Sequence, residues 1–249
     1  MKLLVDIGNS RVKWSLLDRD SLGSQRAADH AAWQVEDWQR TLFAAPGIDR
    51  VLAASTCASA AALLDTAARG ATGRPVEFVR STREAAGVRN AYRDPGLLGV
   101  DRWLAVIAAH ARVDGPCCVA DFGTATTFDA IDADGTHLGG YIVPGPALMV
   151  ASLHAGTSDL AHRTAVSGVA GDAPLADNTR DAIERGCRLA AAAFVDRGVR
   201  DVSARLGVAP RLLLTGGAAS QVAALLETPA DVVEDLVIQG LAALSRSST

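Results

Sequence analysis

Short apolar runs alternate with longer stretches of helical spacing along most of the 249-residue chain. Apolar runs bounded by turn residues predict buried strands, and apolar positions that recur every third or fourth residue predict helices. We expect strands at 2–7, 12–18, 50–54, 76–79, 117–122, 125–131, 137–143 and 211–215. We expect helices at 31–45, 58–69, 97–112, 147–155, 178–199 and 234–246. This alternation predicts an α/β fold.

The pattern restarts near the middle of the chain, after an Asp-Gly-Pro break. Residues 3–18 (LLVDIGNSRVKWSLLD) and 118–132 (CVADFGTATTFDAID) share one plan: an apolar strand, an aspartate, an apolar residue, a glycine, small or polar residues and a second strand. The two aspartates, Asp6 and Asp121, lie much farther apart than the solenoid period of about 20–50 residues. The repeat therefore predicts two similar domains, 1–115 and 116–249.

The turn that follows Asp6 carries groups suited to phosphate. Gly8 has no side chain, so an anion can approach the closely spaced backbone N–H groups. Asn9 and Ser10 add side-chain donors, and Lys13 on the outgoing strand can reach a terminal phosphate. Asp6 ends an apolar strand, where α/β proteins place ligand groups, and a single carboxylate acting through water suits Mg²⁺.

The second loop, 121–127, repeats this logic with threonine hydroxyls, so the two loops together can grip one phosphate chain. A pair of ordinary hairpin turns is the alternative. The glycines of 215–218 close a strand and open a helix, which suits either a ligand that packs on backbone or a simple turn. Asp101 and Arg102 begin an apolar helix, where they can serve as a base beside an anion clamp or merely as a helix cap.

Composition narrows the classes of function. The net charge is −4, the isoelectric point is near 5.7, and no Lys/Arg-rich run occurs, so nucleic acid is not an expected partner. No apolar stretch approaches the roughly 20 residues of a membrane span, and an acid at position 6 is incompatible with a signal peptide. The four cysteines form no C-x-x-C pair and are expected to be small core residues in a reducing cytoplasm.

Six segments, taken in order, resemble the motifs of type III pantothenate kinases. They are D-x-G-N-[ST]-x-x-K at 6–13, Y-x-x-P-x-x-L-G-x-D-R at 92–102, D-x-G-T-A at 121–125, G-G-x-I-x-P-G at 139–145, N-T-x-x-A-I-x-x-G at 178–186 and L-T-G-G at 214–217. A short motif such as T-G-G is nonspecific alone, but six in the family's order and spacing are specific. The resemblance extends from residue 3 to about residue 241.

The resemblance implies a fold, a reaction and partners. The fold is α/β, with two duplicated ribonuclease-H-like domains of the actin-like ATPase type and an interdomain cleft. The reaction is phosphorylation of pantothenate by ATP to 4'-phosphopantothenate, the first step of coenzyme A biosynthesis. The implied cofactors are Mg²⁺ with ATP and a monovalent cation, K⁺ or NH₄⁺. The implied assembly is a homodimer with the substrate site near its interface.

The same resemblance implies roles for individual residues. Asp101 is the general base. Pantothenate is held by Tyr92, Gly99, Val100, Arg102 and, across the dimer interface, Thr179. ATP is bound by Asp6, Ile7, Gly8, Asn9, Ser10, Arg11, Val12, Lys13, Thr124 and Gly216. Asp6 also serves Mg²⁺, and Asp121 lies near the monovalent cation.

Two departures from the family pattern stand out. Ser10 replaces the more usual threonine and keeps the hydroxyl, and residues 157–162 lack the family's proline, which leaves Thr157 as an open candidate. The five histidines match no motif and are expected to be structural. Two rival functions remain: another kinase of the superfamily, which would lack the 92–102 segment, and a non-catalytic transcription accessory factor, which would have lost its acidic and basic site residues.

Overall fold

A computed structural model describes residues 1–156 and 175–247 of the chain. These residues form two compact units. One consists of Met1–Asp114, Asp134–His137 and the residues from Asp235 onward, and the other of Gly115–Ala133 and Leu138–Glu234. The chain therefore returns to its first unit twice, once with a short turn and once with its last helix.

A six-stranded sheet forms the centre of the first unit. Its strands are β1 (Lys2–Ile7), β2 (Arg11–Asp18), β3 (Ser21–Leu22), β4 (Arg26–Asp29), β5 (Arg50–Ser55) and β6 (Glu77–Phe78). The order is β3-β2-β1-β5-β6, and β4 also pairs with β2. β1 runs antiparallel to β2 and parallel to β5. Ligand groups at the carboxyl ends of β1 and β5 thus share one edge of the sheet.

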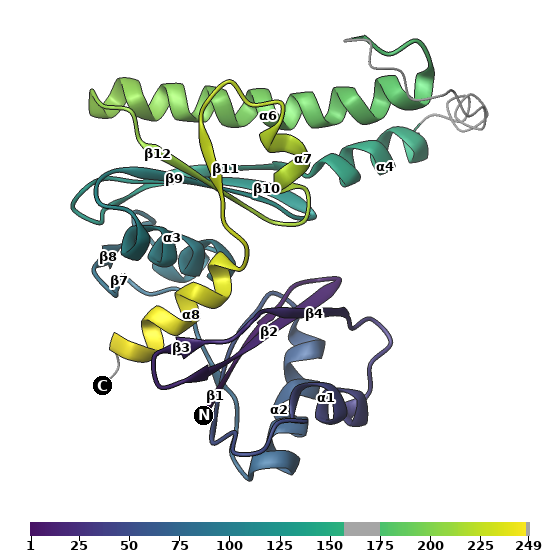
Figure 1. Cartoon of the computed structure of the whole chain (residues 1–249), viewed down its shortest axis with the longest axis vertical. Helices are drawn as coiled ribbons and strands as arrows, with labels where there is room; N and C mark the ends of the chain where they lie inside the picture. Colours follow the sequence, from purple (N-terminus) through teal and green to yellow (C-terminus); the bar gives the residue numbers. More distant parts are fainter. Residues whose placement is uncertain (157–174, 248–249) are drawn as a thin grey trace. The chain divides into compact units, whose positions relative to one another are not determined.

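Helices cover both faces of this sheet (Figure 1). They are α1 (Val35–Leu42), α2 (Ala58–Thr72), α3 (Val100–Arg112) and α8 (Leu236–Ser247), and a short hairpin, β7 (Glu84–Ala85) and β8 (Val88–Arg89), precedes α3. Alternate residues of β1 face opposite ways. Leu3, Val5 and Ile7 pack with α1 and α2 in one apolar cluster. Leu4 packs with α3 and α8 in another, so this sheet is buried on both faces.

The second unit repeats this topology. Its sheet has the order β11-β10-β9-β12-β13, and its strands are β9 (Cys117–Phe122), β10 (Ala125–Ile131), β11 (His137–Pro144), β12 (Arg211–Thr215) and β13 (Ala230–Val232). β9 pairs antiparallel with β10 and parallel with β12, as β1 pairs with β2 and β5. The duplication inferred from the sequence is therefore a duplication of structure, and the α/β prediction is confirmed.

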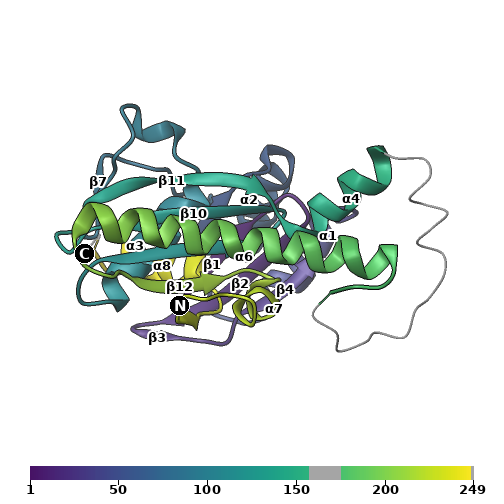
Figure 2. The same cartoon turned by 90° about the horizontal axis from the view of Figure 1, so that it is seen from above.

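The helices of the second unit are α4 (Pro146–Gly156), α6 (Thr179–Leu206) and α7 (Ala219–Ala223). Figure 2 shows α6 lying along the sheet. Its Ala191, Val195 and Val199 pack against Phe128 and Leu214 of the sheet in one buried cluster. No helix in the described part of the chain is long and apolar enough to cross a membrane.

Element boundaries differ from the sequence predictions at several ends. The first helix covers Val35–Leu42 rather than 31–45, and α3 begins at Val100 after a 3-10 turn at Pro95–Leu97. α6 continues past the predicted residue 199 to Leu206, where Gly207 ends it in a left-handed cap. The sequence patterns missed β3, β4, β7, β8, β13 and α7. These elements have two to five residues each, too short for a periodic pattern, and are fixed by their neighbours.

Candidate active site

The first phosphate-type loop is a tight turn between β1 and β2. The Gly8 N–H donates to the Arg11 carbonyl at 3.0 Å, which closes the turn. Asp6 lies directly opposite Lys13 in the strand register, so both side chains project from the same face. Because Leu4 packs toward α3 and α8, Asp6, two residues farther along β1, projects on that face as well.

His30 holds this loop through the carbonyls of Gly8 and Ser10, a role that the sequence did not predict. Its Nε2 donates to the Gly8 carbonyl at 2.8 Å, and its backbone N–H reaches the Ser10 carbonyl at 3.4 Å. The imidazole is only 6% exposed and lies against the Trp38 ring, with centroids 5.7 Å apart. No local sequence pattern predicts that His30 binds the carbonyl of Gly8, which is 22 residues away. Only the folded structure identifies this contact.

The residues around the turn differ in what they can offer a ligand. Ile7 and Val12 are fully buried in the apolar core, so they present backbone groups only. Arg11 lies 3.4 Å from Asp29 in an exposed ion pair. Asn9 and Ser10 are exposed at the tip of the turn. The groups able to meet a phosphate are thus the turn amides, the side chains of Asn9 and Ser10, and the Asp6–Lys13 pair.

Tyr92, Asp101 and Arg102 form a second cluster in the same unit. The Arg102 Nη1 donates to the Tyr92 hydroxyl at 2.9 Å, and its guanidinium carbon is 5.8 Å from the Tyr92 ring centroid. Asp101 Oδ1 accepts from the Arg102 N–H at 2.8 Å in the first turn of α3. A Cβ at Gly99 would lie 2.6 Å from that same oxygen, so the carboxylate position requires glycine there. The cluster pairs a carboxylate with a buried cation and a phenol.

The Gly8 turn and this second cluster lie at the same edge of the sheet. Val79, just after β6, donates its N–H to the Ala53 carbonyl at 2.8 Å, near the carboxyl end of β5. Two residues later the Ser81 hydroxyl donates to the Leu98 carbonyl at 2.7 Å, which ties the start of α3 to this edge. Asp6 is the register partner of the residue that follows Ala53. The first unit therefore gathers the Asp6 and Asp101 segments on one sheet edge.

The second unit brings three further motifs together around Asp121. Gly123 N–H donates to the Ala125 carbonyl at 3.1 Å, closing a turn like that at Gly8, and Gly145 N–H donates to the Thr124 carbonyl at 2.9 Å. Gly216 has a φ of +94°, and a Cβ there would lie 2.6 Å from the Phe122 nitrogen and would overlap the Asp121 carboxylate. Only glycine fits this close approach.

Two predicted residues stand outside these groupings. Thr179 opens α6, where the Asn178 side chain caps the helix by accepting from the Asp181 N–H at 3.0 Å. These cap contacts hold the start of α6 and do not involve the loop around Asp121. Thr157 and the 157–162 segment lie outside the described residues.

The Asp6 loop offers a fit for Mg²⁺ that arrives with a nucleotide. Within the ranges 1–156 and 175–247 no group of three or more His, Cys, Asp or Glu side chains is arranged to hold a metal by itself. Mg²⁺ commonly uses one or two carboxylates, with phosphate and water oxygens completing its octahedron. One aspartate beside an open turn of backbone amides suits that mode of binding.

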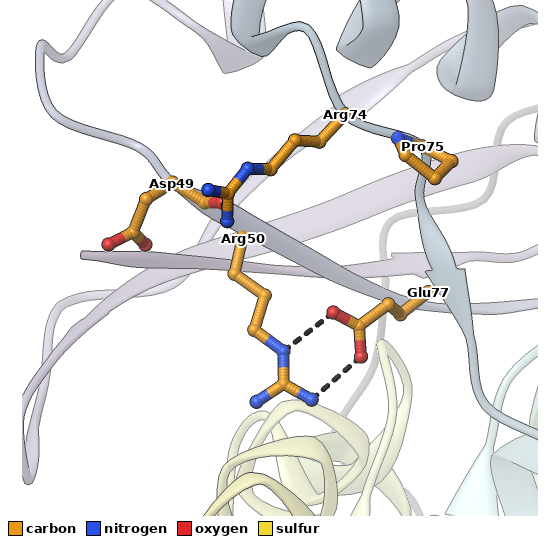
Figure 3. A pocket seen from close by; sticks show the side chains of 5 residues that line it. All are labelled: Asp49, Arg50, Arg74, Pro75 and Glu77. Carbon is orange, nitrogen blue, oxygen red and sulfur yellow. Dashed lines mark hydrogen bonds and ion pairs between the residues drawn. The ribbon is translucent and has the colours of Figure 1, made fainter.

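A cavity of about 320 Å³ lies at the opposite edge of the same sheet, between Asp49, Arg50, Arg74, Pro75 and Glu77 (Figure 3). β5 begins there, whereas the Gly8 turn follows the carboxyl end of β1. The two strands are parallel neighbours, and their register pairs Lys2 with Arg50 and Ile7 with Ser55. At about 3.3 Å per residue the two places are separated by the length of the strands. The cavity therefore does not belong to the candidate site.

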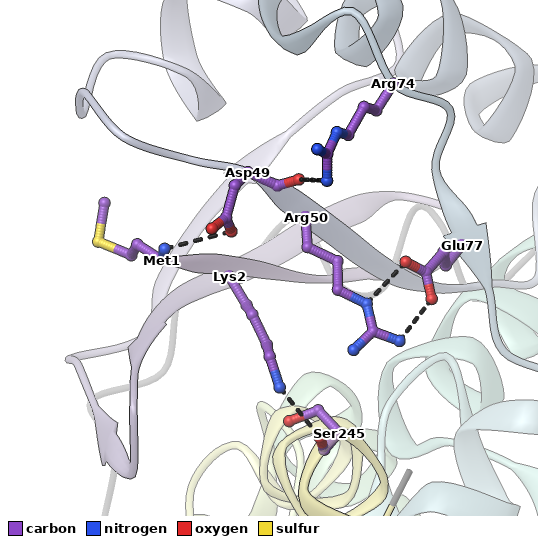
Figure 4. Close-up of polar contacts among 7 residues, drawn as sticks. All are labelled: Met1, Lys2, Asp49, Arg50, Arg74, Glu77 and Ser245. Atoms are coloured by element: carbon purple, nitrogen blue, oxygen red, sulfur yellow. Dashed lines mark hydrogen bonds and ion pairs between the residues drawn. The ribbon is translucent and has the colours of Figure 1, made fainter. Parts of the chain in front are cut away.

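Polar contacts in and beside this cavity join segments that are distant in sequence (Figure 4). The N-terminal amine of Met1 contacts Asp49, and Lys2 donates to the Ser245 carbonyl of α8 at 2.9 Å. Arg50 forms two hydrogen bonds with the Glu77 carboxylate, at 2.6 and 2.7 Å. These contacts tie β1 to Asp49 and to α8, and β5 to β6, so the residues around the cavity are expected to stabilise the first unit.

Glu77→Gln is expected to lower the free energy of unfolding by about 0.5–1 kcal/mol, since the pair is half exposed. The Arg50 hydrogen bonds lower the pKa of Glu77. The stabilisation is therefore complete above the unfolded pKa of about 4.3 and is lost as the pH falls through the lower folded value. Urea unfolding of the wild type and of Glu77→Gln, at pH 7 and at pH 3, measures the difference in their free energies of unfolding at each pH. Glu227→Gln, which breaks a looser 3.9 Å pair, is the control; equal losses in both variants would contradict the assignment.

Solved structures of low sequence identity share this fold. A protein from Sinorhizobium meliloti, provisionally described as a 2-dehydro-3-deoxygalactonokinase, covers 100% of this chain and 99% of its own, with a TM-score of 0.58 and 17% identity. Component A of (R)-2-hydroxyglutaryl-CoA dehydratase from Acidaminococcus fermentans covers 100% and 99%, with a TM-score of 0.55 and 14% identity. The duplicated sheets and their Asp–Gly loops thus define the actin-like ATPase and sugar kinase fold class.

Sequence relatives narrow the class to one family. The type III pantothenate kinase family matches residues 2–201. A type III pantothenate kinase from Aromatoleum aromaticum is 38% identical over 99% of this chain and 98% of its own length, and one from Chromohalobacter salexigens is 40% identical over 97% and 86%. The chain belongs to the type III pantothenate kinase family.

A further solved structure bears on the alternatives. A Campylobacter jejuni protein, provisionally described as a Baf family transcriptional activator, covers 99% of this chain and 98% of its own, with a TM-score of 0.55 and 22% identity. At that identity the likeness shows the fold alone. The family match therefore supports the kinase over the transcription factor.

Proposed function

We propose that this chain phosphorylates pantothenate with ATP, giving 4'-phosphopantothenate at the start of coenzyme A biosynthesis. The observation that carries this proposal is the shared sheet edge in the first unit. A phosphate-type loop with Asp6 and Lys13 and a carboxylate–arginine–tyrosine cluster both lie there. Phosphoryl transfer needs these two components, a phosphate cradle and a positioned acceptor hydroxyl.

In the proposed reaction Asp101 is the general base. Its Oδ1 is fixed by the Arg102 N–H, which leaves the second carboxylate oxygen to receive the proton of the substrate hydroxyl. Arg102 and Tyr92 hold the carboxylate of pantothenate, because a buried guanidinium pairs well with a carboxylate. Gly99 and Val100 shape the backbone beside them.

ATP is proposed to bind the residues of both Asp–Gly loops. The Gly8 turn supplies backbone amides, Asn9 and Ser10 supply side-chain donors, and Lys13 supplies positive charge to the phosphates. Asp6 would hold Mg²⁺, which neutralises phosphate charge when bound. Thr124 and Gly216 of the second unit are proposed to contact ATP, and Asp121, which Gly216 approaches closely, to lie near K⁺ or NH₄⁺.

The assembly and surroundings are proposals of the same kind. A homodimer would bring Thr179, at the start of α6, toward the partner's pantothenate. A reducing cytoplasm agrees with four free cysteines. Of these, Cys117 and Cys118 are buried core residues, and burial raises the pKa of Cys117 to about 12, which keeps that thiol protonated and inert. We propose neither nucleic acid nor membrane as a partner.

A coupled kinase assay with purified protein, pantothenate and Mg·ATP tests the proposal. We expect ADP release that requires pantothenate and is severalfold faster in K⁺ than in Na⁺ at equal ionic strength. Phosphorylation of a sugar or carboxylate in place of pantothenate would assign the chain to another kinase of the superfamily. No turnover with any of these acceptors, from folded protein, would favour the transcription accessory role.

A further inference from the structure

Arg83, which lies outside every motif, grips the backbone of the loop that carries Tyr92. Its Nη1 donates to the Tyr92 carbonyl at 2.7 Å and to the Asn90 carbonyl at 3.3 Å, and its Nη2 donates to the Arg93 carbonyl at 2.7 Å. A guanidinium presents five donors in a rigid plane, so one side chain can hold several carbonyls in a fixed arrangement. Residues 90–93 lie outside the strands and helices, although the Asn90 N–H still donates to the Arg83 backbone carbonyl at 2.9 Å. The Arg83 side chain therefore supplies the hydrogen bonds that hold the carbonyls of this loop.

Asn90 holds the same loop from inside. Its side chain is 4% exposed, and its Oδ1 accepts from the Tyr92 N–H at 3.0 Å. Its Nδ2 donates to the carbonyls of Thr82 and Pro95, at 3.2 and 3.3 Å. A buried amide with donors and acceptor all engaged specifies one loop conformation.

The Tyr92 ring is fixed as well. The Arg102 guanidinium lies over one part of the ring, and the fully buried His137 ring stacks on it with centroids 6.2 Å apart and an interplanar angle of 18°. His137 ends the short Asp134–His137 turn that belongs to the first unit. Arg89 anchors that turn through its N–H to the Gly135 carbonyl at 2.9 Å.

We propose that Arg83 and Asn90 are positioning residues that determine the affinity for the acceptor substrate by fixing the Tyr92 hydroxyl against Arg102. This inference rests on the proposed function of the Tyr92–Arg102 pair. Neither side chain needs to touch the substrate. Their contribution is preorganisation: without them the loop must be ordered when substrate binds, and that ordering cost appears as weaker binding.

Arg83→Gln is the test variant, since Arg83 is exposed and its loss leaves the core intact. We expect the KM for pantothenate to rise about tenfold, equivalent to losing one or two net hydrogen bonds, with the KM for ATP and kcat within about twofold. The KM of Arg83→Lys for pantothenate should lie between those of the wild type and Arg83→Gln, since an ammonium keeps the charge but lacks the planar fork. Arg80→Gln, an equal loss of charge at an exposed neighbouring position, should match the wild type.

Hydrogen exchange gives a readout that does not depend on activity. The Tyr92 amide should exchange at least about tenfold faster in Arg83→Gln than in the wild type or Arg80→Gln, while amides of β1 and β5 remain unchanged. Asn90→Ala should give the same local change if its melting temperature shows that it folds.

The outcomes separate this inference from the proposed function. A wild-type protein that does not phosphorylate pantothenate contradicts the proposed function, and the acceptor role of the loop with it. Normal pantothenate turnover with an unchanged KM in Arg83→Gln overturns the positioning role alone. Unchanged exchange of the Tyr92 amide overturns the structural basis of the inference, whatever the substrate.

Discussion

Asp101→Asn is expected to lower kcat by about 10²–10⁴-fold, the usual contribution of a general base. The amide retains an oxygen that can accept from the Arg102 N–H, so the first turn of α3 and the KM for pantothenate should change little. Steady-state kinetics at saturating Mg·ATP and pantothenate measure the effect, and a thermal melt establishes that the variant is folded.

Asp94→Asn is the matched control for this variant. Asp94 lies in the same segment and caps the 3-10 turn at Pro95–Leu97, where its side chain accepts from the Gly96 N–H at 3.0 Å. It should keep kcat within about twofold of the wild type, because it caps a turn without acting as a base. Turnover near the wild-type rate in Asp101→Asn would remove Asp101 from the mechanism.

Asp6→Asn is expected to lower kcat/KM for Mg·ATP by about 10²–10³-fold, the scale of one lost electrostatic stabiliser in an active site. The neutral amide loses the charge that attracts Mg²⁺ and keeps the size of the side chain, so β1 should pair with β2 as before. Raising Mg²⁺ or ATP should recover part of the activity. The KM for pantothenate should stay within about twofold.

Asp18→Asn, an exposed change at the end of the same hairpin, is the control and should leave kcat/KM unaltered. If the loss in Asp6→Asn does not respond to either Mg²⁺ or ATP, the proposed metal role of Asp6 is wrong. Equal losses in both variants would instead indicate that the hairpin tolerates no change of charge.

Most of the regular elements around the site could be predicted from local patterns. The strands that end at Ile7 and Phe122 are runs of apolar residues closed by a glycine turn, and the structure has both at the expected positions. The ends of helices were less predictable, because caps such as Gly207 depend on where tertiary packing stops. The phosphate role of the loop after Asp6 followed from the chemistry of its residues, whereas the roles of Tyr92 and Thr179 came from the family resemblance.

The residues that support the site could not be predicted. His30, Arg83 and Asn90 all act on backbone carbonyls or amides of other segments, and such contacts leave no periodic or motif signal. Their partners become neighbours only when the turns fold. A histidine that holds the Gly8 turn is indistinguishable, in sequence, from one that packs in a core.

The sequence by itself determined the α/β class, the duplication and the two Asp–Gly loops, because strand periodicity, turn glycines and repeat order are local properties of the chain. Only the tertiary structure decided that α8 and the Asp134–His137 turn return to the first unit. Apolar helices such as α3 and α8 carry the same pattern whichever sheet they cover. Their burial against Leu4 and Leu52 depends on contacts between segments that are distant in sequence, so it is fixed only when the whole unit packs.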